Sequence, residues 1–386
     1  MPYLDYAASA PLRAEALAAM RPLLERPAAN PSSQHGPGRA ARAAVETARE
    51  QVAALVGAAP GEVVFTSGGT EADNLAVKGA LLARPAGARG LVCTAVEHHA
   101  VLDAAAWAEA DAGAKVALAP VDQAGRVDPE RLGGLLEPGR TALVAVMAAN
   151  NEVGTGQPVA AAAALAHAAG ALLLCDAVQA AGLPGVDMGR DGIDLLALAA
   201  HKLGGPTGVG ALVVRAGAEL RPLLHGGGQE RGVRSGTLPA AAIAGFGAAA
   251  AAALAEREAP GYAAALAALR ARLLAGLRAL EPALAVNGDP GSGLPGLLSV
   301  RFPGRRAEDL LLLLDRQGVA CSAGSACASG AVTPSHVLLA MGREPAEARE
   351  TVRFSLGHAS TEADVDAAVA AVREALRVLA PQEAAR

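Results

Sequence analysis

Short apolar runs alternate, over most of the chain, with longer segments whose apolar residues recur at helical spacing. Such runs are typical of strands buried in a parallel sheet, and the longer segments are typical of amphipathic helices. The sequence predicts strands at Glu62–Phe65, Leu91–Thr94, Val116–Ala119, Leu143–Met147, Ala171–Cys175, Leu195–Ala200 and Val209–Val214. It predicts helices at Arg13–Leu24, Arg39–Val56, Glu71–Leu82, His98–Asp111, Pro129–Leu136 and Val159–Ala169. This alternation indicates an α/β fold with a mostly parallel, seven-stranded type of sheet covered by helices.

The pattern changes after an alanine-rich segment that ends at residue 255. The next helices are predicted at Ala263–Leu280, Ala307–Gln317 and Glu362–Leu379, and the next strands at Leu297–Phe302, Val319–Cys321 and Thr351–Leu356. These elements indicate a second, smaller α/β domain. We therefore expect an N-terminal segment (residues 1–13) that packs with the small domain, a large ligand-binding domain (residues 14–255) and a small C-terminal domain (residues 256–386).

Composition and charge narrow the class of protein. The formal net charge is −5 with no basic cluster, which disfavours direct binding to nucleic acid. The uncharged run Thr237–Ala255 is long enough to cross a membrane, but it is mostly alanine and glycine, so we expect a buried helix. We expect no signal peptide, because the N-terminal residues lack a basic region followed by an apolar stretch. Cys93 and Cys175 lie within apolar runs as small core residues, and we expect a soluble, cytoplasmic protein in a reducing environment.

Two predicted strands, Ala171–Cys175 and Leu195–Ala200, end in residues that together suggest a chemistry. The first runs into Asp176, and the second runs into His201 and Lys202, with the lysine 202 − 176 = 26 residues after the aspartate. Because open α/β sheets bind ligands at the carboxyl ends of their strands, we expect the carboxylate and the amine at one edge. Pyridoxal 5'-phosphate chemistry needs this pair, since the lysine bonds to the aldehyde and the aspartate keeps the pyridine nitrogen protonated. The alternative is a turn-capping aspartate and a solvated lysine.

Other polar residues are predicted at the same edge of the sheet. The turn Thr66–Glu71 contains Gly69 and Thr70 and enters a helix, whose free N–H groups suit a phosphate; the alternative is an ordinary glycine-rich turn. His98 can stack on a flat cofactor or move protons, and its alternative is a polar residue that begins a helix. Asn151 can bind a ring hydroxyl or a substrate carboxylate, or it can simply form a turn.

Three further features lie later in the chain. The glycine-rich segment His225–Thr237 carries two arginines, which favours an anion site or an interface over a linker. Cys327 is surrounded by small residues that cannot bury it, so we interpret it as a functional thiol rather than a spare surface cysteine. A metal site is disfavoured because Cys321 and Cys327 lack a partner pair at zinc spacing. Arg353 lies within a predicted strand, where an arginine is costly unless it faces a cleft and a carboxylate.

Short stretches spread over nearly the whole chain form a specific combination: LDYAASAP, NPSSQH, TSGGTEADN, EHHAV, NNEVG, CDAVQ, HK, GGGQERGVRSGTLP, GSACAS and VRFSLG. Through them the chain resembles the cysteine desulfurases of the class V aminotransferase superfamily, in their NifS/IscS-like group I branch. The resemblance implies the fold-type-I architecture of pyridoxal-phosphate-dependent transferases and a homodimer with shared active sites. It implies conversion of L-cysteine to L-alanine, with sulfur held as a persulfide and passed to an iron–sulfur scaffold protein or a tRNA-thiolation enzyme.

The same resemblance assigns roles around the cofactor. Lys202 matches the lysine that binds the cofactor covalently and carries protons, and Asp176 matches the partner of the pyridine nitrogen. Gln179 matches the donor to the ring hydroxyl, and His98 matches the residue stacked on the ring. The residues matching the phosphate site are Gly69, Thr70, His201 and, from the other subunit, Thr237.

On the substrate side, Asn151 and Arg353 match the groups that hold the carboxylate, with Asn151 also beside the cofactor, and Cys327 matches the nucleophile that accepts sulfur. Ala199 departs from the family pattern, which often has a serine there that contributes to the phosphate site; the change bears on cofactor affinity rather than on chemistry. The alternatives are a selenocysteine lyase, another class V aminotransferase, and a non-catalytic scaffold. The intact cofactor residues argue against the scaffold.

Overall fold

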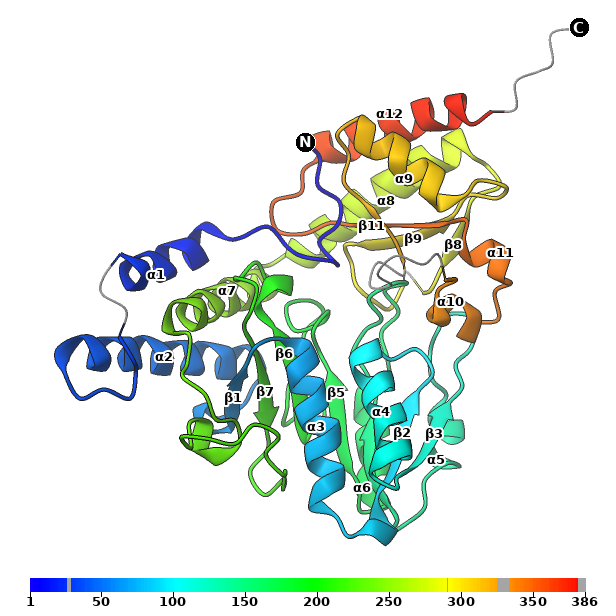
Figure 1. The fold of residues 1–386 in the computed structure, drawn as a ribbon. Helices are drawn as coiled ribbons and strands as arrows, with labels where there is room; N and C mark the ends of the chain where they lie inside the picture. Colours follow the sequence, from blue (N-terminus) through cyan, green and yellow to red (C-terminus); the bar gives the residue numbers. More distant parts are fainter. Residues whose placement is uncertain (26–28, 290, 325–332, 381–386) are drawn as a thin grey trace, which may run out of the picture.

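The computed structural model describes residues 1–25, 29–289, 291–324 and 333–380 (Figure 1). In this part of the chain the larger sheet has seven strands, in the order β1-β7-β6-β5-β4-β2-β3. They are β1 (Val63–Thr66), β2 (Gly90–Thr94), β3 (Lys115–Ala119), β4 (Thr141–Ala145), β5 (Leu172–Asp176), β6 (Leu195–Ala199) and β7 (Gly210–Val214). Only β7, among these strands, runs antiparallel to its neighbours. The mostly parallel sheet predicted from the apolar runs is therefore confirmed.

The helices of the large domain are α1 (Ala14–Leu24), α2 (Gly36–Leu55), α3 (Gly69–Ala83), α4 (His99–Asp111), α5 (Pro129–Gly133), α6 (Val159–Ala168) and α7 (Ala240–Glu258). They cover both faces of the sheet because successive strand residues point to opposite faces. In β6, Leu196 and Leu198 enter the apolar cluster that also contains side chains of α2, α6 and α7. Leu195 and Ala197 enter the other cluster, with side chains of α3 and α4.

Helix α7 is, within the described ranges, the one helix long and apolar enough to cross a membrane. It packs against α1 and α2, and its Ile243 and Phe246 are fully buried (Figure 1). A Cβ on Gly247 would lie 2.5 Å from the Cα of Ala48 in α2, so this close contact requires glycine. The alanine- and glycine-rich composition thus allows close helix packing, as expected for a core helix.

The second sheet, in the residues described, has four antiparallel strands in the order β10-β11-β9-β8. Its elements are β8 (Ala285–Asn287), β9 (Leu297–Arg301), β10 (Ser322–Ala323), β11 (Thr351–Ser355), α8 (Tyr262–Leu280), α9 (Ala307–Arg316), α10 (His336–Ala340), α11 (Pro345–Ala348) and α12 (Glu362–Val378). Helices α8, α9 and α12 share one apolar core with the sheet. The sequence does not predict β8, α10 and α11, because elements of three to five residues carry too little periodicity.

The strand predicted at Val319–Cys321 is replaced by a pairing with the N-terminal segment. Strand β10 begins only after this run, and Ala320 forms an isolated parallel bridge with Tyr3. The N–H of Leu4 donates to the carbonyl of Ala320 at 2.8 Å, and the N–H of Ser355 donates to the carbonyl of Leu4 at 2.7 Å. The N-terminal segment therefore fills the gap beside β11 and then turns toward the large domain (Figure 1).

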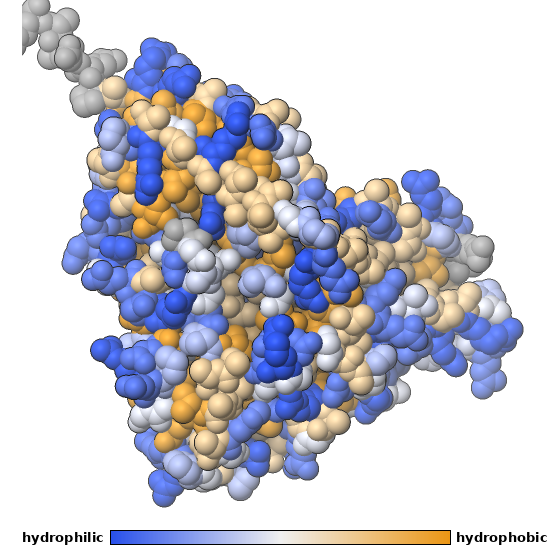
Figure 2. Space-filling model, turned by 180° about the vertical axis from the view of Figure 1, so that it is seen from behind, coloured by the Kyte–Doolittle hydropathy of each residue, from blue (hydrophilic) through white to orange (hydrophobic). Residues whose placement is uncertain are grey.

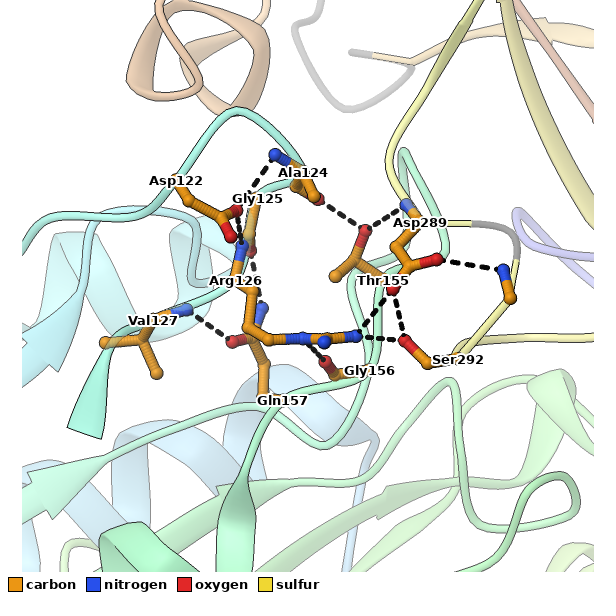
Figure 3. A network of polar contacts seen from close by, with 11 residues as sticks. Asp122, Ala124, Gly125, Arg126, Val127, Thr155, Gly156, Gln157, Asp289 and Ser292 are labelled. Atoms are coloured by element: carbon orange, nitrogen blue, oxygen red, sulfur yellow. Dashed lines mark hydrogen bonds and ion pairs between the residues drawn. The ribbon is translucent and has the colours of Figure 1, made fainter.

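A polar network also joins the two domains (Figure 3). Thr155, after β4, donates from Oγ1 to the carbonyl of Ala124 at 2.6 Å and accepts from the N–H of Asp289 at 3.0 Å. Arg126 pairs with Asp289 at 3.0 Å and also contacts Ser292. Because Asp289 and Ser292 precede β9, this network holds the loop after β4 against the small domain.

Candidate active site

A cavity of about 310 Å³ lies at the carboxyl ends of the large-sheet strands, where they meet the N-terminal segment and β11. Sites for small molecules typically measure roughly 300–1,000 Å³. Thr237 is exposed and does not line the cavity, and Cys327 lies outside the described residues. The predicted site residues that do line it are Gly69, Thr70, His98, Asn151, Asp176, Gln179, His201, Lys202 and Arg353.

Asp176 ends β5 and is almost fully removed from solvent. Its Oδ1 accepts a hydrogen bond from the N–H of Val178 at 2.9 Å. Burial raises the pKa of Asp176, and this hydrogen bond, His98 and Lys202 oppose the rise. A buried carboxylate with few fixed donors is suited to pair with a positive ring nitrogen.

Two further buried carboxyl groups lie near Asp176, and the sequence assigns neither of them a role. Asp73, on α3, lines the cavity, and its Oδ1 has no partner among the described residues. Glu97 accepts hydrogen bonds from the hydroxyl of Thr94 at 2.7 Å and the N–H of Met147 at 2.9 Å. Burial, opposed by these two hydrogen bonds and reinforced by Asp176, raises the pKa of Glu97 to about 8. Burial, reinforced by the charges of Asp176 and Glu97, also raises the pKa of Asp73 well above its ordinary value.

His98 is the N-cap of α4 and lines the cavity. Its Nδ1 accepts from the N–H of Ala100 at 3.1 Å, so the neutral ring carries its proton on Nε2. Burial lowers the pKa of His98; Asp176 opposes this effect, whereas Lys202 and neighbouring histidines add to it. The helix-cap interpretation is confirmed, and the same neutral ring is placed to lie against a flat ligand.

Lys202 ends the 3-10 turn that follows β6. Its Nζ donates to the carbonyls of Ala7 at 2.6 Å and Ala8 at 2.8 Å. The side-chain amide of Gln179 donates to the same Ala7 carbonyl at 2.8 Å. The N-terminal backbone therefore holds the two side chains at the cavity wall, a contact that the sequence does not reveal.

The glycine-rich turn after β1 brings a helix start to the cavity. Helix α3 begins at Gly69, with Gly68 as its N-cap, and Thr70 lies in its first turn. A Cβ on Gly69 would come within 2.8 Å of Cγ2 of Val178, so glycine allows this helix start to approach the loop after β5. The free N–H groups and the Thr70 hydroxyl form a suitable place for a phosphate.

His201 lies beside this helix start, on the cavity side of the turn that ends in Lys202. Its Nδ1 is 3.3 Å from the Oγ of Ser9, in the N-terminal segment. Burial, followed by the nearby charge of Lys202, lowers the pKa of His201 to about 4. The ring is therefore neutral at physiological pH and has one N–H to donate to an anion.

Arg353, in the middle of β11, is only 2% exposed. Its Nη1 donates to the carbonyl of Asn151 at 2.8 Å, and its Nη2 donates to Oδ1 of Asp5 at 3.0 Å. Its Nε is buried and has no partner in the part of the chain described. Arg353 thus faces both a cleft, the cavity, and a carboxylate, that of Asp5, as expected for an arginine within a strand.

The glycine-rich segment that carries Thr237 is fixed to its own chain, although Thr237 itself is exposed. Glu230 is buried in an ion pair with an arginine of α2 at 2.8 Å. Arg231 donates to a carbonyl of β1 at 2.8 Å, and Arg234 pairs with Glu71 at the start of α3 at 2.7 Å. Both arginines that the sequence associates with an anion site therefore have partners within the chain.

The cysteines in the described residues are packed to different degrees. Cys93 and Cys175 are buried, as predicted for core residues, and Cys321 is half-buried. Burial and the charge of Asp5, opposed by Arg353, raise the pKa of Cys321 to about 12. This thiol therefore stays protonated at neutral pH and is a poor nucleophile.

The family model for class V aminotransferases matches residues 2–368, and the chain belongs to this family. A Mycobacterium tuberculosis relative named IscS-like cysteine desulfurase is 46% identical over 374 residues, which are 96% of this chain and 94% of the relative. A solved NifS-like protein has a TM-score of 0.90 at 35% identity, covering 97% of this chain and 99% of its own. A structure described as SspA in complex with cysteine has a TM-score of 0.79 at 33% identity, covering 92% and 99%. The resemblance and the fold-type-I architecture expected from the sequence are confirmed.

Proposed function

We propose that this chain is a pyridoxal-phosphate-dependent cysteine desulfurase, which converts L-cysteine to L-alanine and takes up the sulfur as a persulfide on Cys327. The convergence of Lys202, Asp176 and Arg353 on one cavity carries the proposal. The names of the relatives support it, since one is a cysteine desulfurase and another is seen with cysteine.

The residues of the cavity fit pyridoxal 5'-phosphate. Lys202 would hold the aldehyde carbon, Asp176 the pyridine nitrogen and the start of α3 the phosphate, with His98 against the ring. Two observations support this fit: Gly69 lets the start of α3 approach the loop after Asp176, where a side chain would collide with Val178, and Asp73 Oδ1 is buried without a partner in the described chain. When bound, the cofactor supplies an aldehyde that attaches amines and a ring that stores an electron pair.

The residues of the chain bind the substrate and move its protons. Arg353 would pair with the substrate carboxylate beside Asn151, which directs the α-carbon toward Lys202. The Nζ of Lys202 would take the α-proton and later return a proton to the product. The neutral ring of His98 would keep water from one face of the reacting atoms.

Cys327 is the proposed acceptor of the sulfur. Its thiolate attacks the substrate sulfur, so an S–S bond forms while the bond between that sulfur and the β-carbon breaks. The electron pair of the broken bond stays with the carbon, which takes up a proton and becomes the methyl group of alanine. The reaction of L-cysteine and a thiol to L-alanine and a persulfide balances without an external oxidant or reductant.

We further propose a cytoplasmic homodimer in which Thr237 of each chain completes the phosphate site of the other. The exposure of Thr237 at the end of a well-anchored segment supports this arrangement. Leu12, Leu17 and Leu24 are also exposed, in and beside α1. This helix belongs to an arm that projects from the large domain, at the right of Figure 2, where hydrophobic and hydrophilic side chains mix.

The onward acceptor of the persulfide is proposed to be an iron–sulfur scaffold protein or a tRNA-thiolation enzyme.

Cys327→Ser tests the reaction itself, with Cys321→Ser as the matched control. Cys327→Ser should release sulfide at least about a hundredfold more slowly, because no thiolate is left to take the sulfur. Cys321→Ser should keep its activity because that thiol is protonated.

Sulfide release from L-cysteine under reductant, together with the change in the visible spectrum on adding L-cysteine, measures both variants. Full activity of Cys327→Ser would contradict the nucleophile and favour a selenocysteine lyase. If the wild-type protein gains no visible absorbance on addition of the cofactor, the proposed enzyme activity is rejected and a non-catalytic scaffold is favoured.

A further inference from the structure

Backbone pairing of the N-terminal segment with β11 places Asp5 next to Arg353. Asp5 forms a parallel bridge with Ser355. The N–H of Ser355 donates to the carbonyl of Leu4 at 2.7 Å, and the N–H of Ala7 donates to Oγ of Ser355 at 2.9 Å. Asp5 thereby lies beside β11 opposite Ser355, two residues along the strand from Arg353, and accepts from Nη2 of Arg353 at 3.0 Å. The placement depends on main-chain hydrogen bonds and not only on the attraction of two charges.

Two nitrogens of the Arg353 guanidinium have fixed acceptors, and the third nitrogen, Nε, has none. The carbonyl of Asn151 and the carboxylate of Asp5 accept from Nη1 and Nη2, whereas the buried Nε has no partner in the described chain. A buried arginine with an unpaired donor is costly, and a ligand carboxylate in the cavity would offset part of that cost by pairing with the guanidinium charge. Arg353 lines this cavity, whereas Asp5 does not.

We propose that Asp5 is a positioning residue for recognition of the substrate carboxylate, which holds the charged guanidinium of Arg353 at the wall of the cavity. The inference rests on the proposed function and deepens it, because it assigns carboxylate recognition to a pair of residues. Asp5 acts through Arg353 and touches no reacting atom. Its side chain is 19% exposed, so part of its charge remains solvated and a second carboxylate can approach the same guanidinium.

Instead of positioning Arg353, Asp5 would have the opposite effect on ligand binding if it competed with the ligand carboxylate for the guanidinium. The two effects differ in sign. If Asp5 positions the guanidinium, its removal weakens carboxylate binding; if Asp5 competes, its removal strengthens it. An uncharged Asp5→Asn variant keeps an oxygen that accepts from Nη2, so positioning predicts an effect intermediate between those of wild type and Asp5→Ala.

Two inhibitors of L-cysteine turnover by the holoenzyme separate these effects. The first, 3-mercaptopropionate, has the thiol and the carboxylate but no amine; the second, cysteamine, has the thiol and the amine but no carboxylate. For Asp5→Ala we expect the Ki of 3-mercaptopropionate and the KM of L-cysteine to rise about tenfold, and for Asp5→Asn about threefold. The Ki of cysteamine should change less than about twofold, and kcat less than about threefold, because only carboxylate binding is affected.

Glu256→Gln is the matched control. Glu256 forms the bidentate pair with another buried arginine at the N-terminal segment, Arg13, at 2.7 and 2.6 Å, but it does not line the active-site cavity. This variant should lower the melting temperature without changing the Ki of 3-mercaptopropionate. If Asp5→Ala does not fold, the isosteric Asp5→Asn decides the question.

An unchanged or lower Ki of 3-mercaptopropionate in the folded Asp5 variants overturns this inference and leaves the proposed function intact. An equal rise for both inhibitors also overturns it, because that result shows a general loss of structure. By contrast, an Arg353→Gln variant with an unchanged Ki contradicts the carboxylate site itself, and a wild type without desulfuration contradicts the proposed function.

Discussion

Two groups of residues, in the cavity wall and in contact with it, are brought together by the chain in different ways. The first, the sheet-edge group, consists of His98, Asp176, Gln179, His201 and Lys202. The second, the Arg353 group, consists of Asp5, Asn151 and Arg353. The sheet-edge group follows parallel strands of a single sheet, whereas the Arg353 group joins both domains across 348 residues. Changes in the first group should therefore affect cofactor chemistry, and changes in the second should affect substrate recognition with the cofactor retained.

The largest effect is expected from Lys202→Ala, in the sheet-edge group. Desulfuration should fall at least about 10³-fold, because the amine that binds the cofactor and moves the α-proton is lost. Reduction with borohydride should then attach no cofactor to the chain, as mass spectrometry would show. Binding of 3-mercaptopropionate, measured by calorimetry, should persist because the Arg353 group is unchanged.

Lys78→Ala is the control for this variant. Lys78 lies on α3 with its ammonium 4.7 Å from the ring centre of Trp107, away from the cavity. Its loss should cost about 0.5–1 kcal/mol of stability at this half-exposed site and leave activity unchanged. Residual turnover of Lys202→Ala within tenfold of wild type would remove the distinction between the two groups.

A smaller effect is expected from Arg353→Lys, in the second group. Lysine keeps the positive charge but loses the planar fork, so the KM for L-cysteine should rise about 10- to 100-fold. Cofactor content, measured by the visible absorbance of the purified protein, should stay that of wild type. Arg13→Lys changes the other buried arginine near the N-terminal segment and should lower the melting temperature without this rise in KM. Loss of cofactor from Arg353→Lys would mean that the two groups are not separable.

The smallest effect concerns Glu97→Gln, behind the sheet-edge group, and it depends on pH. The carboxyl of Glu97 has a pKa of about 8 in the folded chain and about 4.5 when unfolded. Between these values the unfolded chain releases a proton that the folded chain retains, so wild-type stability falls as pH rises from about 4.5 to 8. Each pKa unit corresponds to at most roughly 1.4 kcal/mol.

Glu97→Gln keeps the oxygen that accepts from Thr94 and Met147 but cannot ionise. Its free energy of unfolding in urea should therefore decrease less than that of wild type between pH 5.5 and 8. Glu137→Gln, at an exposed pair with Lys115 where the pKa of the glutamate is lowered, should follow wild type over this range. Parallel pH curves for wild type and Glu97→Gln would show that Glu97 ionises freely.

The sheet-edge group was predictable because each of its members follows a buried apolar run, and parallel strands end at a common edge. A different rule, helical spacing, would have found Asp73, which lies three residues after Thr70 on α3 and thus on the same helix face. Glu97 is the first residue of the stretch EHHAV, but its role depends on the depth of its burial. Burial of a single carboxyl is a tertiary property that local pattern does not encode.

The Arg353 group was predictable only in part. An arginine within a strand is unusual on its own, and the family resemblance matches Arg353 to a carboxylate-binding residue. Its partner Asp5 was not predicted, since no spacing rule connects residues 348 positions apart. The strand predicted at Val319–Cys321 failed for a related reason, because the N-terminal segment supplies the backbone partner of Ala320. Both the partner of Arg353 and the backbone partner of Ala320 are determined by pairing between distant parts of the chain.

The contact between Asp5 and Arg353 also constrains the order in which the protein is completed during synthesis. The ribosome adds Arg353 348 residues after Asp5, whereas the last strand of the large sheet ends at Val214. The large sheet can therefore assemble while the N-terminal segment still lacks the strand beside which it belongs. A growing chain can therefore bring the sheet-edge group together before it can complete the Arg353 group.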